Sequence, residues 1–209
     1  MDFGAFEDKY SRYPVIKSAY FALEDNPAYV RRLVSEWVRK KWLIELRRGM
    51  YLINADHVLN VTERFQVANL LYEPSYVSLE GALSFHGMIP EGVPQVTSVS
   101  TRKTARFSNA LGTFSYSAVK KELFWGYEKY KLGKGGALVA VPEKALLDLI
   151  YLRKGELNEA GEVIESLRLD DIKPLNARSL MAAAKRFGNA RILQVAKGLC
   201  GPELRRAKP

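Results

Sequence analysis

Residues 26–53 read NPAYVRRLVSEWVRKKWLIELRRGMYLI, and this stretch decides the fold of the N-terminal part of the chain. Asn26 and Pro27 predict a helix start, because Asn side chains cap free backbone N–H groups and proline suits the first helical position. We expect this helix to continue to about Lys41. Its apolar positions recur every three or four residues and form one buried stripe: Val30, Leu33, Val34, Trp37 and Val38. Its opposite face is polar and carries Tyr29, Arg31, Arg32, Ser35 and Arg39.

The second half of this stretch predicts a β-hairpin. Two β-prone runs, residues 42–46 and 50–53, flank the sequence Arg47-Arg48-Gly49. Glycine relieves the tight turn that such a hairpin needs. The hairpin tip is therefore expected to be basic.

Two shorter helices are predicted upstream. Aromatic residues at helical spacing indicate a first helix over residues 2–12, and residues 17–23 are typical of a second. Helix, helix, basic helix and basic-tipped hairpin, in this order, indicate a winged helix-turn-helix over residues 1–55. In that arrangement the third helix enters the major groove of duplex DNA, and Arg47 and Arg48 reach a flanking phosphate or the minor groove.

The candidate DNA contacts lie on the polar helix face and at the hairpin tip: Tyr29, Arg31, Arg32, Ser35, Arg39, Arg47 and Arg48. Arginine reads guanine through two hydrogen bonds, whereas this helix lacks the Asn or Gln that reads adenine. Two other interpretations remain open. Charged helix faces are often only solvated surface, and winged helices also serve as protein-interaction modules.

The composition narrows the class of protein. The 209 residues include 32 Lys and Arg against 23 Asp and Glu, and the resulting net charge of +9 favours a polyanionic partner such as nucleic acid. One cysteine excludes an intrachain disulfide, and with two histidines it leaves too few ligands for a Cys/His zinc site. No apolar run is long enough to span a membrane and no signal peptide is recognisable. We therefore expect a cytoplasmic protein without metal or cofactor.

The charge is unevenly distributed along the chain. Residues 27–48 carry a net charge of +5, residues 101–134 of +6 and residues 173–209 of +8, whereas residues 143–172 carry −4. One basic region is enough for DNA. The others are free to bind a second partner or to extend the same footprint.

Residues 56–209 predict a mixed α/β domain, so the whole chain is expected to be α+β. Helices are expected over residues 62–72, 79–88 and 142–152, and as two segments between 176 and 199 that are separated near Gly188. Strands are expected over residues 76–77, 95–100, 112–116, 124–127 and 137–141. Residues 102–106 are expected to form a basic turn, and residues 133–136 a hairpin loop rather than a phosphate-binding loop.

Four ordered blocks in this second part resemble one known family. Residues 76–90, YVSLEGALSFHGMIP, are similar to the pattern YxSLExALxxHGLIPE, and residues 96–104, VTSVSTRKT, to xTSVTTxKT. Residues 114–127 contain FSY and LFWGY, similar to FSYxxIxxxLFxGY, and residues 141–148, VPEKALLD, are similar to xPEKALLD. The family is that of the AbiE-type antitoxins of type IV toxin–antitoxin systems. The resemblance covers most of the chain, including an RRGxY motif in the hairpin.

This resemblance implies that the two parts of the chain have different functions. In the family, the winged helix binds inverted repeats in its own promoter and represses the operon. The C-terminal antitoxin domain counteracts a nucleotidyltransferase-like toxin encoded next door, without a stable complex, as part of phage defence by abortive infection. The residues that carry antitoxin activity are undefined, and we expect the basic turn with Arg102, Lys103 and Arg106 to contribute. The alternative is a stand-alone winged-helix regulator without a toxin, whose C-terminal domain dimerises or binds a ligand.

Patterns that suggest catalysis are weak, so we expect no enzymatic activity. Glu7-Asp8-Lys9 and Asp171-Ile172-Lys173 resemble fragments of metal-nuclease sites, but chance explains them better. His86 falls at a predicted helix end, where a capping role is expected. A metal-dependent nuclease remains the third hypothesis.

The helix that follows Pro142 also carries ionisable residues. We expect Glu143, Lys144 and Asp148 to act as a helix cap and as surface ion pairs, without a chemical role.

Overall fold

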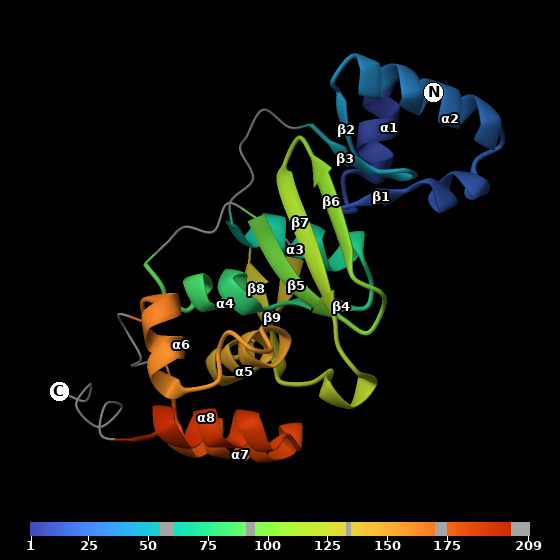
Figure 1. The fold of residues 1–209 in the computed structure, drawn as a ribbon. Coiled ribbons are helices and arrows are strands. Elements are labelled where there is room, and N and C mark those ends of the chain that lie inside the picture. The colour runs from blue at the N-terminus through green and yellow to red at the C-terminus, as the bar shows by residue number, and fades with distance from the viewer. Residues whose placement is uncertain (55–60, 91–94, 133–134, 170–174, 202–209) are drawn as a thin grey trace.

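The structure is a computed structural model that describes residues 1–54, 61–90, 95–132, 135–169 and 175–201 (Figure 1). Helices and two β-sheets alternate in a mixed α+β fold, which confirms the expected class. The smaller sheet belongs to the N-terminal part and the larger sheet to the rest. The boundary expected at residue 55 adjoins residues 55–60, which lie outside the described residues.

Residues 1–54 form the N-terminal unit, which contains α1 (Phe3–Tyr10), β1 (Ile16–Lys17), the 3-10 helix Ser18–Leu23, α2 (Pro27–Arg39), β2 (Leu43–Arg47) and β3 (Met50–Ile53). Its strands are antiparallel in the order β1-β3-β2. The predicted helices and hairpin are all present. The second helix is of the 3-10 type, and β1 before it has no sequence signal because two residues are too few to show an alternation.

Local capping sets the bounds of α2. The Asn26 side chain accepts a hydrogen bond from the backbone N–H of Tyr29 at 3.0 Å, as the sequence predicts. At the other end, the N–H of Trp42 donates to the carbonyl of Trp37 at 2.9 Å, while Lys41 adopts a left-handed conformation with φ of 60°. This C-terminal cap, with a left-handed residue after the helix, ends the helix at Arg39, slightly before the expected end at Lys41.

Aromatic side chains form the core of the N-terminal unit. The Phe6 ring centroid lies 4.8 Å from that of Trp37 and 4.6 Å from that of Tyr10, and Phe21 contacts both Phe6 and Tyr10. All four side chains are buried. Trp37 belongs to the apolar stripe of α2, so this packing turns the polar face of the helix outward.

The larger part contains, in chain order, α3 (Val61–Leu71), β4 (Ser75–Val77), α4 (Leu79–Phe85), β5 (Gln95–Ser100), β6 (Ala105–Asn109), β7 (Gly112–Ala118), the 3-10 helix Lys121–Leu123, β8 (Tyr127–Leu132), β9 (Gly135–Ala140), α5 (Pro142–Leu152), α6 (Ala160–Leu167), α7 (Ala177–Phe187) and α8 (Ala190–Leu199). The strand order is β6-β7-β5-β4-β9-β8. Neighbours β5 and β7 are parallel, as are β4 and β9, and the others are antiparallel. Helix α3 packs on β4, β5 and β9, whereas α5 to α8 gather on the side away from the N-terminal unit (Figure 1).

One predicted strand is wrong. Residues 124–126 form an irregular segment after the 3-10 helix, and β8 begins only at Tyr127. Gly126 has a φ of +75°, and a Cβ there would lie 2.9 Å from Cγ of Lys144. The segment bends because the long Lys144 side chain occupies the space that a regular strand would need. The sequence patterns also did not indicate β6, β8 as a full strand, or α6.

The N-terminal unit is docked onto the edge strand β6 of the large sheet. The Asn109 amide donates a hydrogen bond to the carbonyl of Leu46 at 3.0 Å, and the guanidinium of Arg47 lies 5.5 Å from the Phe107 ring centroid. Lys17 of β1 forms an ion pair with Glu73, between α3 and β4. Val15, Leu46 and Met50 are buried in the hydrophobic core of the large domain, so apolar packing joins the two sheets together with these polar contacts and stacking.

An acidic residue in the N-terminal unit predicts a pH dependence of stability. Hydrogen bonds from Lys9 and from the Tyr10 hydroxyl hold the pKa of Glu24 below its ordinary value. A carboxyl group with a lowered folded-state pKa stabilises the fold above its ordinary pKa, and this contribution is lost as pH falls through the lowered value. We expect Glu24→Gln to destabilise the unit at neutral pH and the deficit to shrink below about pH 4.

Urea denaturation followed by tryptophan fluorescence measures this effect. Glu7→Gln, an exposed change on α1, is the matched control. A Glu24→Gln deficit of the same size at neutral and acidic pH would contradict the assignment.

Candidate functional site

The predicted polar face of α2 is exposed. Tyr29, Arg31, Arg32, Ser35 and Arg39 all lie on the solvent side of this helix. The Arg32 guanidinium lies 5.3 Å from the Tyr29 ring centroid, and the Ser35 hydroxyl donates to the backbone carbonyl of Arg31 at 3.0 Å. Within the described residues, the guanidinium groups of Arg31 and Arg39 form no hydrogen bond or ion pair. This face therefore presents free positive charge.

A groove of about 400 Å³ separates α2 from the hairpin. Arg32, Ser35 and Arg39 line its helical wall, and Tyr51 and Glu45 line the hairpin wall. Burial and the nearby Glu45 carboxylate raise the pKa of Tyr51. The carboxylates of Glu36 and Glu45 share this groove with the guanidinium groups of Arg32 and Arg39, so its lining carries charges of both signs.

The two arginines at the hairpin tip point in different directions. Arg48 is exposed, as predicted. Arg47 is half-buried: its Nε lies 2.9 Å from Sδ of Met50, and its guanidinium stacks on Phe107 of β6. Arg47 is the last residue of β2 and lies beside β6, whereas Arg48 belongs to the turn that follows the strand. Arg47 therefore belongs to the contact between the two sheets.

Two exposed lysines extend the basic surface of α2 although they were not among the predicted contacts. Lys40 and Lys41 follow the end of the helix, and Nζ of Lys40 lies 4.8 Å from the Trp42 ring centroid. Their signal in the sequence is the unbroken run Arg39-Lys40-Lys41.

The second predicted basic patch is divided. Arg102 and Lys103 lie in the turn before β6, whereas Arg106 lies on β6 itself, so the expected five-residue turn is shorter. Arg102 stacks on Tyr72 at 4.4 Å and donates to the carbonyl of Glu73 at 3.3 Å.

The two arginines of this patch, Arg102 and Arg106, lie on opposite sides of β6. Tyr72, on which Arg102 stacks, contacts the Phe107 ring at 5.7 Å. Arg106 is next to Phe107 on the strand and therefore faces the opposite side of the sheet. All three basic residues are exposed, but the structure does not bring Arg102 and Arg106 together.

A buried polar network lies between β4 and α5. Nζ of Lys144 contacts a carboxylate oxygen of Asp148 and donates to the Tyr76 hydroxyl at 2.8 Å. Tyr76 and Ser78 each donate to the other carboxylate oxygen of Asp148 at 2.9 Å. Both members of the ion pair are 0% exposed. The expectation of surface pairing for Lys144 and Asp148 is therefore wrong.

Glu143 is also buried, and its carboxylate accepts a hydrogen bond from the backbone N–H of Asn176 at 2.8 Å, just before α7. Glu143 therefore stabilises the start of α7 rather than of its own helix.

Burial acts on both charges of the Lys144–Asp148 pair. It raises the pKa of Asp148 and lowers that of Lys144, while their mutual attraction acts in the opposite direction. The ammonium also lies over the rings of Trp125 and Phe187, at 5.1 and 4.9 Å. Because these aromatic rings enclose the ammonium, the arrangement serves packing rather than chemistry on a substrate.

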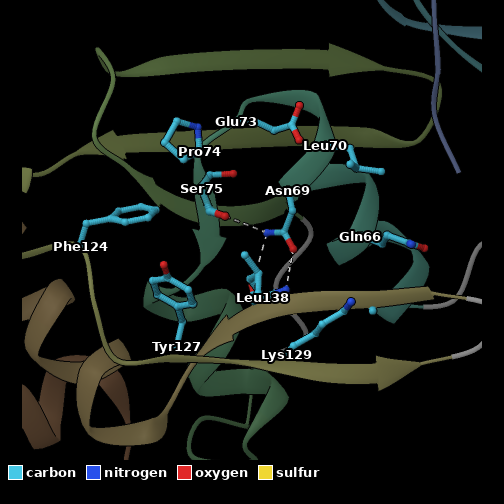
Figure 2. A pocket seen from close by; sticks show the side chains of 11 residues that line it. Gln66, Asn69, Leu70, Glu73, Pro74, Ser75, Phe124, Tyr127, Lys129 and Leu138 are labelled. Atoms are coloured by element: carbon cyan, nitrogen blue, oxygen red, sulfur yellow. Dashed lines mark hydrogen bonds between the residues drawn. The ribbon is translucent and has the colours of Figure 1, made fainter.

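A pocket of about 400 Å³ lies elsewhere in the large domain (Figure 2). Its polar groups come from Gln66, Asn69, Ser75 and Lys129. It lies between α3, the start of β4 and the β8–β9 hairpin. No sequence pattern predicts this pocket, although Asn69 stands out as an amide within the apolar run of α3.

Among the described residues, the candidate catalytic patterns form no common site. His86 is the C-terminal cap of α4, as predicted, and its Nε2 lies 2.8 Å from the carbonyl oxygen of Ala140. Asp171-Ile172-Lys173 and Gly133-Lys134 lie outside the described residues. Among the residues that are described, no group of three or more His, Cys, Asp or Glu side chains is placed to hold a metal ion.

No protein-family model matches the chain, and no curated protein matches it. Within the described part of the chain, no helix is both long and apolar enough to span a membrane. Functional interpretation therefore depends on geometry and on the motif resemblance.

The buried network predicts the effect of removing its cation. Lys144→Met leaves a buried carboxylate without a counterion, which we expect to lower the free energy of unfolding by about 3 kcal/mol near pH 8. Asp148 has a raised folded-state pKa, so stability is gained as pH falls and protonation removes the unpaired charge. The loss is expected to be smaller near pH 5, as measured by urea denaturation.

The double variant Lys144→Met/Asp148→Asn is the matched control. It retains an oxygen acceptor for Tyr76 and Ser78 without a buried charge, so it is expected to recover most of the stability. A double variant no more stable than Lys144→Met at pH 8 would show that charge burial is not the cause.

Proposed function

We propose that the N-terminal unit is a winged helix-turn-helix that binds duplex DNA through α2. The order of its elements supports this assignment: α1, β1, the 3-10 helix, α2 and then the β2–β3 hairpin. A short turn separates the 3-10 helix from α2, and the hairpin lies beside α2 as a wing. This order of elements is the one in which a helix is presented to the major groove.

The main support for this proposal is the unpaired positive charge along α2. Arg31 and Arg39 are exposed and have no acidic partner among the described residues, and Lys40 extends their line. A helix of 13 residues is about 20 Å long and fits into a groove about 12 Å wide. We assign contacts with base edges to Arg32 and Ser35, which belong to this exposed face.

The wing contributes less than the sequence suggests. Arg48 remains as its exposed cation, while Arg47 contacts β6. We assign phosphate contacts to Arg48, Lys40 and Lys41, which fix the position of the protein without reading sequence.

We further propose that the chain is a type IV antitoxin that represses its own operon. This part of the proposal is supported by the four motif blocks similar to AbiE-type antitoxins. The blocks occupy structured elements of the large domain: the β4–α4 segment, β5, the β7–β8 segment and α5. A nucleotidyltransferase-like toxin is the proposed antagonist. A stand-alone regulator remains the alternative, because the DNA-binding face would be the same.

A charge reversal on α2 tests DNA binding. We expect Arg31→Glu/Arg32→Glu to weaken binding to the upstream promoter DNA by about 100-fold or more in a gel-shift titration. The slope of log affinity against log salt is expected to fall by about 2 if both residues contact phosphates. Arg178→Glu/Lys185→Glu reverses two exposed charges on α7 and should change affinity less than about threefold. Equal losses in both variants would refute the proposed face.

A co-expression experiment tests the antitoxin role. The proposal predicts a nucleotidyltransferase-like gene adjacent to its own, and wild-type protein is expected to restore growth when that gene is expressed. Arg31→Glu/Arg32→Glu should restore growth as well, because the large domain is intact. If the wild type does not rescue growth although it shifts promoter DNA, the chain is a regulator and the antitoxin assignment is wrong.

A further inference from the structure

We propose that the pocket between α3, β4 and the β8–β9 hairpin binds a small aromatic ligand with one negative charge. This pocket forms where two central strands, β4 and β9, diverge. β4 and β9 pair only at Val77 and Val139. Beyond this point the Asn69 side chain bridges them: its amide donates to the carbonyls of Ser75 and Leu138, and its oxygen accepts from the N–H of Leu138. Figure 2 shows these bonds at the centre of the pocket.

The pocket is held open by side chains that are already fixed. Asn69 is buried and makes three hydrogen bonds to backbone groups of two strands. Tyr127 stacks on the buried Tyr76, with ring centroids 4.7 Å apart and an interplanar angle of 22°, and Phe124 packs against Tyr127 at 5.3 Å. A preformed site of about 400 Å³ with aromatic walls suits a small planar ligand.

Two glycines at the start of β9 make room for polar side chains at the rim. A Cβ on Gly135 would lie 1.9 Å from the amide nitrogen of Gln66, and a Cβ on Gly136 would lie 2.7 Å from Cε of Lys129. Any larger residue would push these two side chains away from the pocket. Because Gly135 and Gly136 have no side chains, the amide of Gln66 and the ammonium of Lys129 can lie beside the apolar part of the pocket.

A buried hydroxyl in the pocket wall has no partner. Ser75 is 3% exposed, its Oγ makes no hydrogen bond, and the residue lines the pocket. Leaving a buried hydroxyl unpaired costs about 1–3 kcal/mol. A ligand with a polar atom near this wall would remove that cost, whereas a purely aliphatic ligand would not.

The charges at the pocket favour a ligand with one negative charge. Lys129 is exposed and has no ion-pair partner within the described residues, so its ammonium can receive a carboxylate or a single acidic group. Glu73, also in the lining, is already paired with Lys17, so it leaves Lys129 as the unpaired charge of the described lining. One unpaired cation beside aromatic walls favours an aromatic monoanion.

Ligand-observed NMR on the full chain tests the proposal with 1-naphthoate as the probe and decanoate as the aliphatic comparison. We expect 1-naphthoate to bind at millimolar concentration or below, and decanoate more weakly. Lys129→Glu should weaken 1-naphthoate binding about tenfold. Lys131→Glu, the same change two residues along β8 and outside the lining, should weaken binding clearly less than Lys129→Glu does, because its charge is farther from the bound ligand.

Two further variants separate the pocket from a general charge effect. Leu70→Trp fills the slot from α3 and should abolish binding, and Gly136→Ala should weaken it by displacing Lys129. Far-UV circular dichroism identifies the variants that fold. The proposal is overturned if the wild type does not bind 1-naphthoate, if decanoate binds as well, or if folded Lys129→Glu and Gly136→Ala both bind like the wild type. Equal losses in Lys129→Glu and Lys131→Glu would also overturn it.

Discussion

The ion pair between Lys144 and Asp148 is the constraint on which the large domain depends. Two opposite charges with 0% exposure cannot be left unpaired, so every element around them must supply a hydrogen-bond partner or an aromatic ring. Tyr76 of β4 and Ser78 at the start of α4 supply hydroxyl groups. One pair of side chains on α5 thus fixes the central strand and the helix that follows it.

The same pair shapes the segment before β8. The stem of Lys144 packs on Gly126, and its ammonium lies among the rings of Tyr76, Trp125 and Phe187. Phe187 ends α7, so the charge also ties the C-terminal helices to the sheet. Arg186 stacks on the outer side of Trp125 at 4.3 Å and extends this arrangement to the surface. The bend at residues 124–126 leads directly into Tyr127, which forms a wall of the pocket.

Local signals in the sequence predict much of the fold, and their failures have physical reasons. Asn26-Pro27 and Pro142 mark helix starts through capping and fixed backbone angles, and both helices begin there. The exposed face of α2 follows from its apolar period. The direction of Arg47, the burial of Lys144 and the role of Asn69 depend on residues far away in the sequence, so no local pattern contains them. An i, i+4 Lys–Asp pair has the same spacing on a surface helix as in a core.

The proposed DNA-binding face lies on one side of α2, which an aromatic core holds outward, and the wing docks this unit onto a sheet built around a buried charge. Hydrogen–deuterium exchange of the full chain, with and without duplex DNA from its own promoter, tests this most directly. We expect DNA to protect the backbone of residues 26–41 and of the β2–β3 hairpin, and to leave α7 and α8 unchanged. Protection confined to α7 and α8, with none on α2, would contradict this expectation.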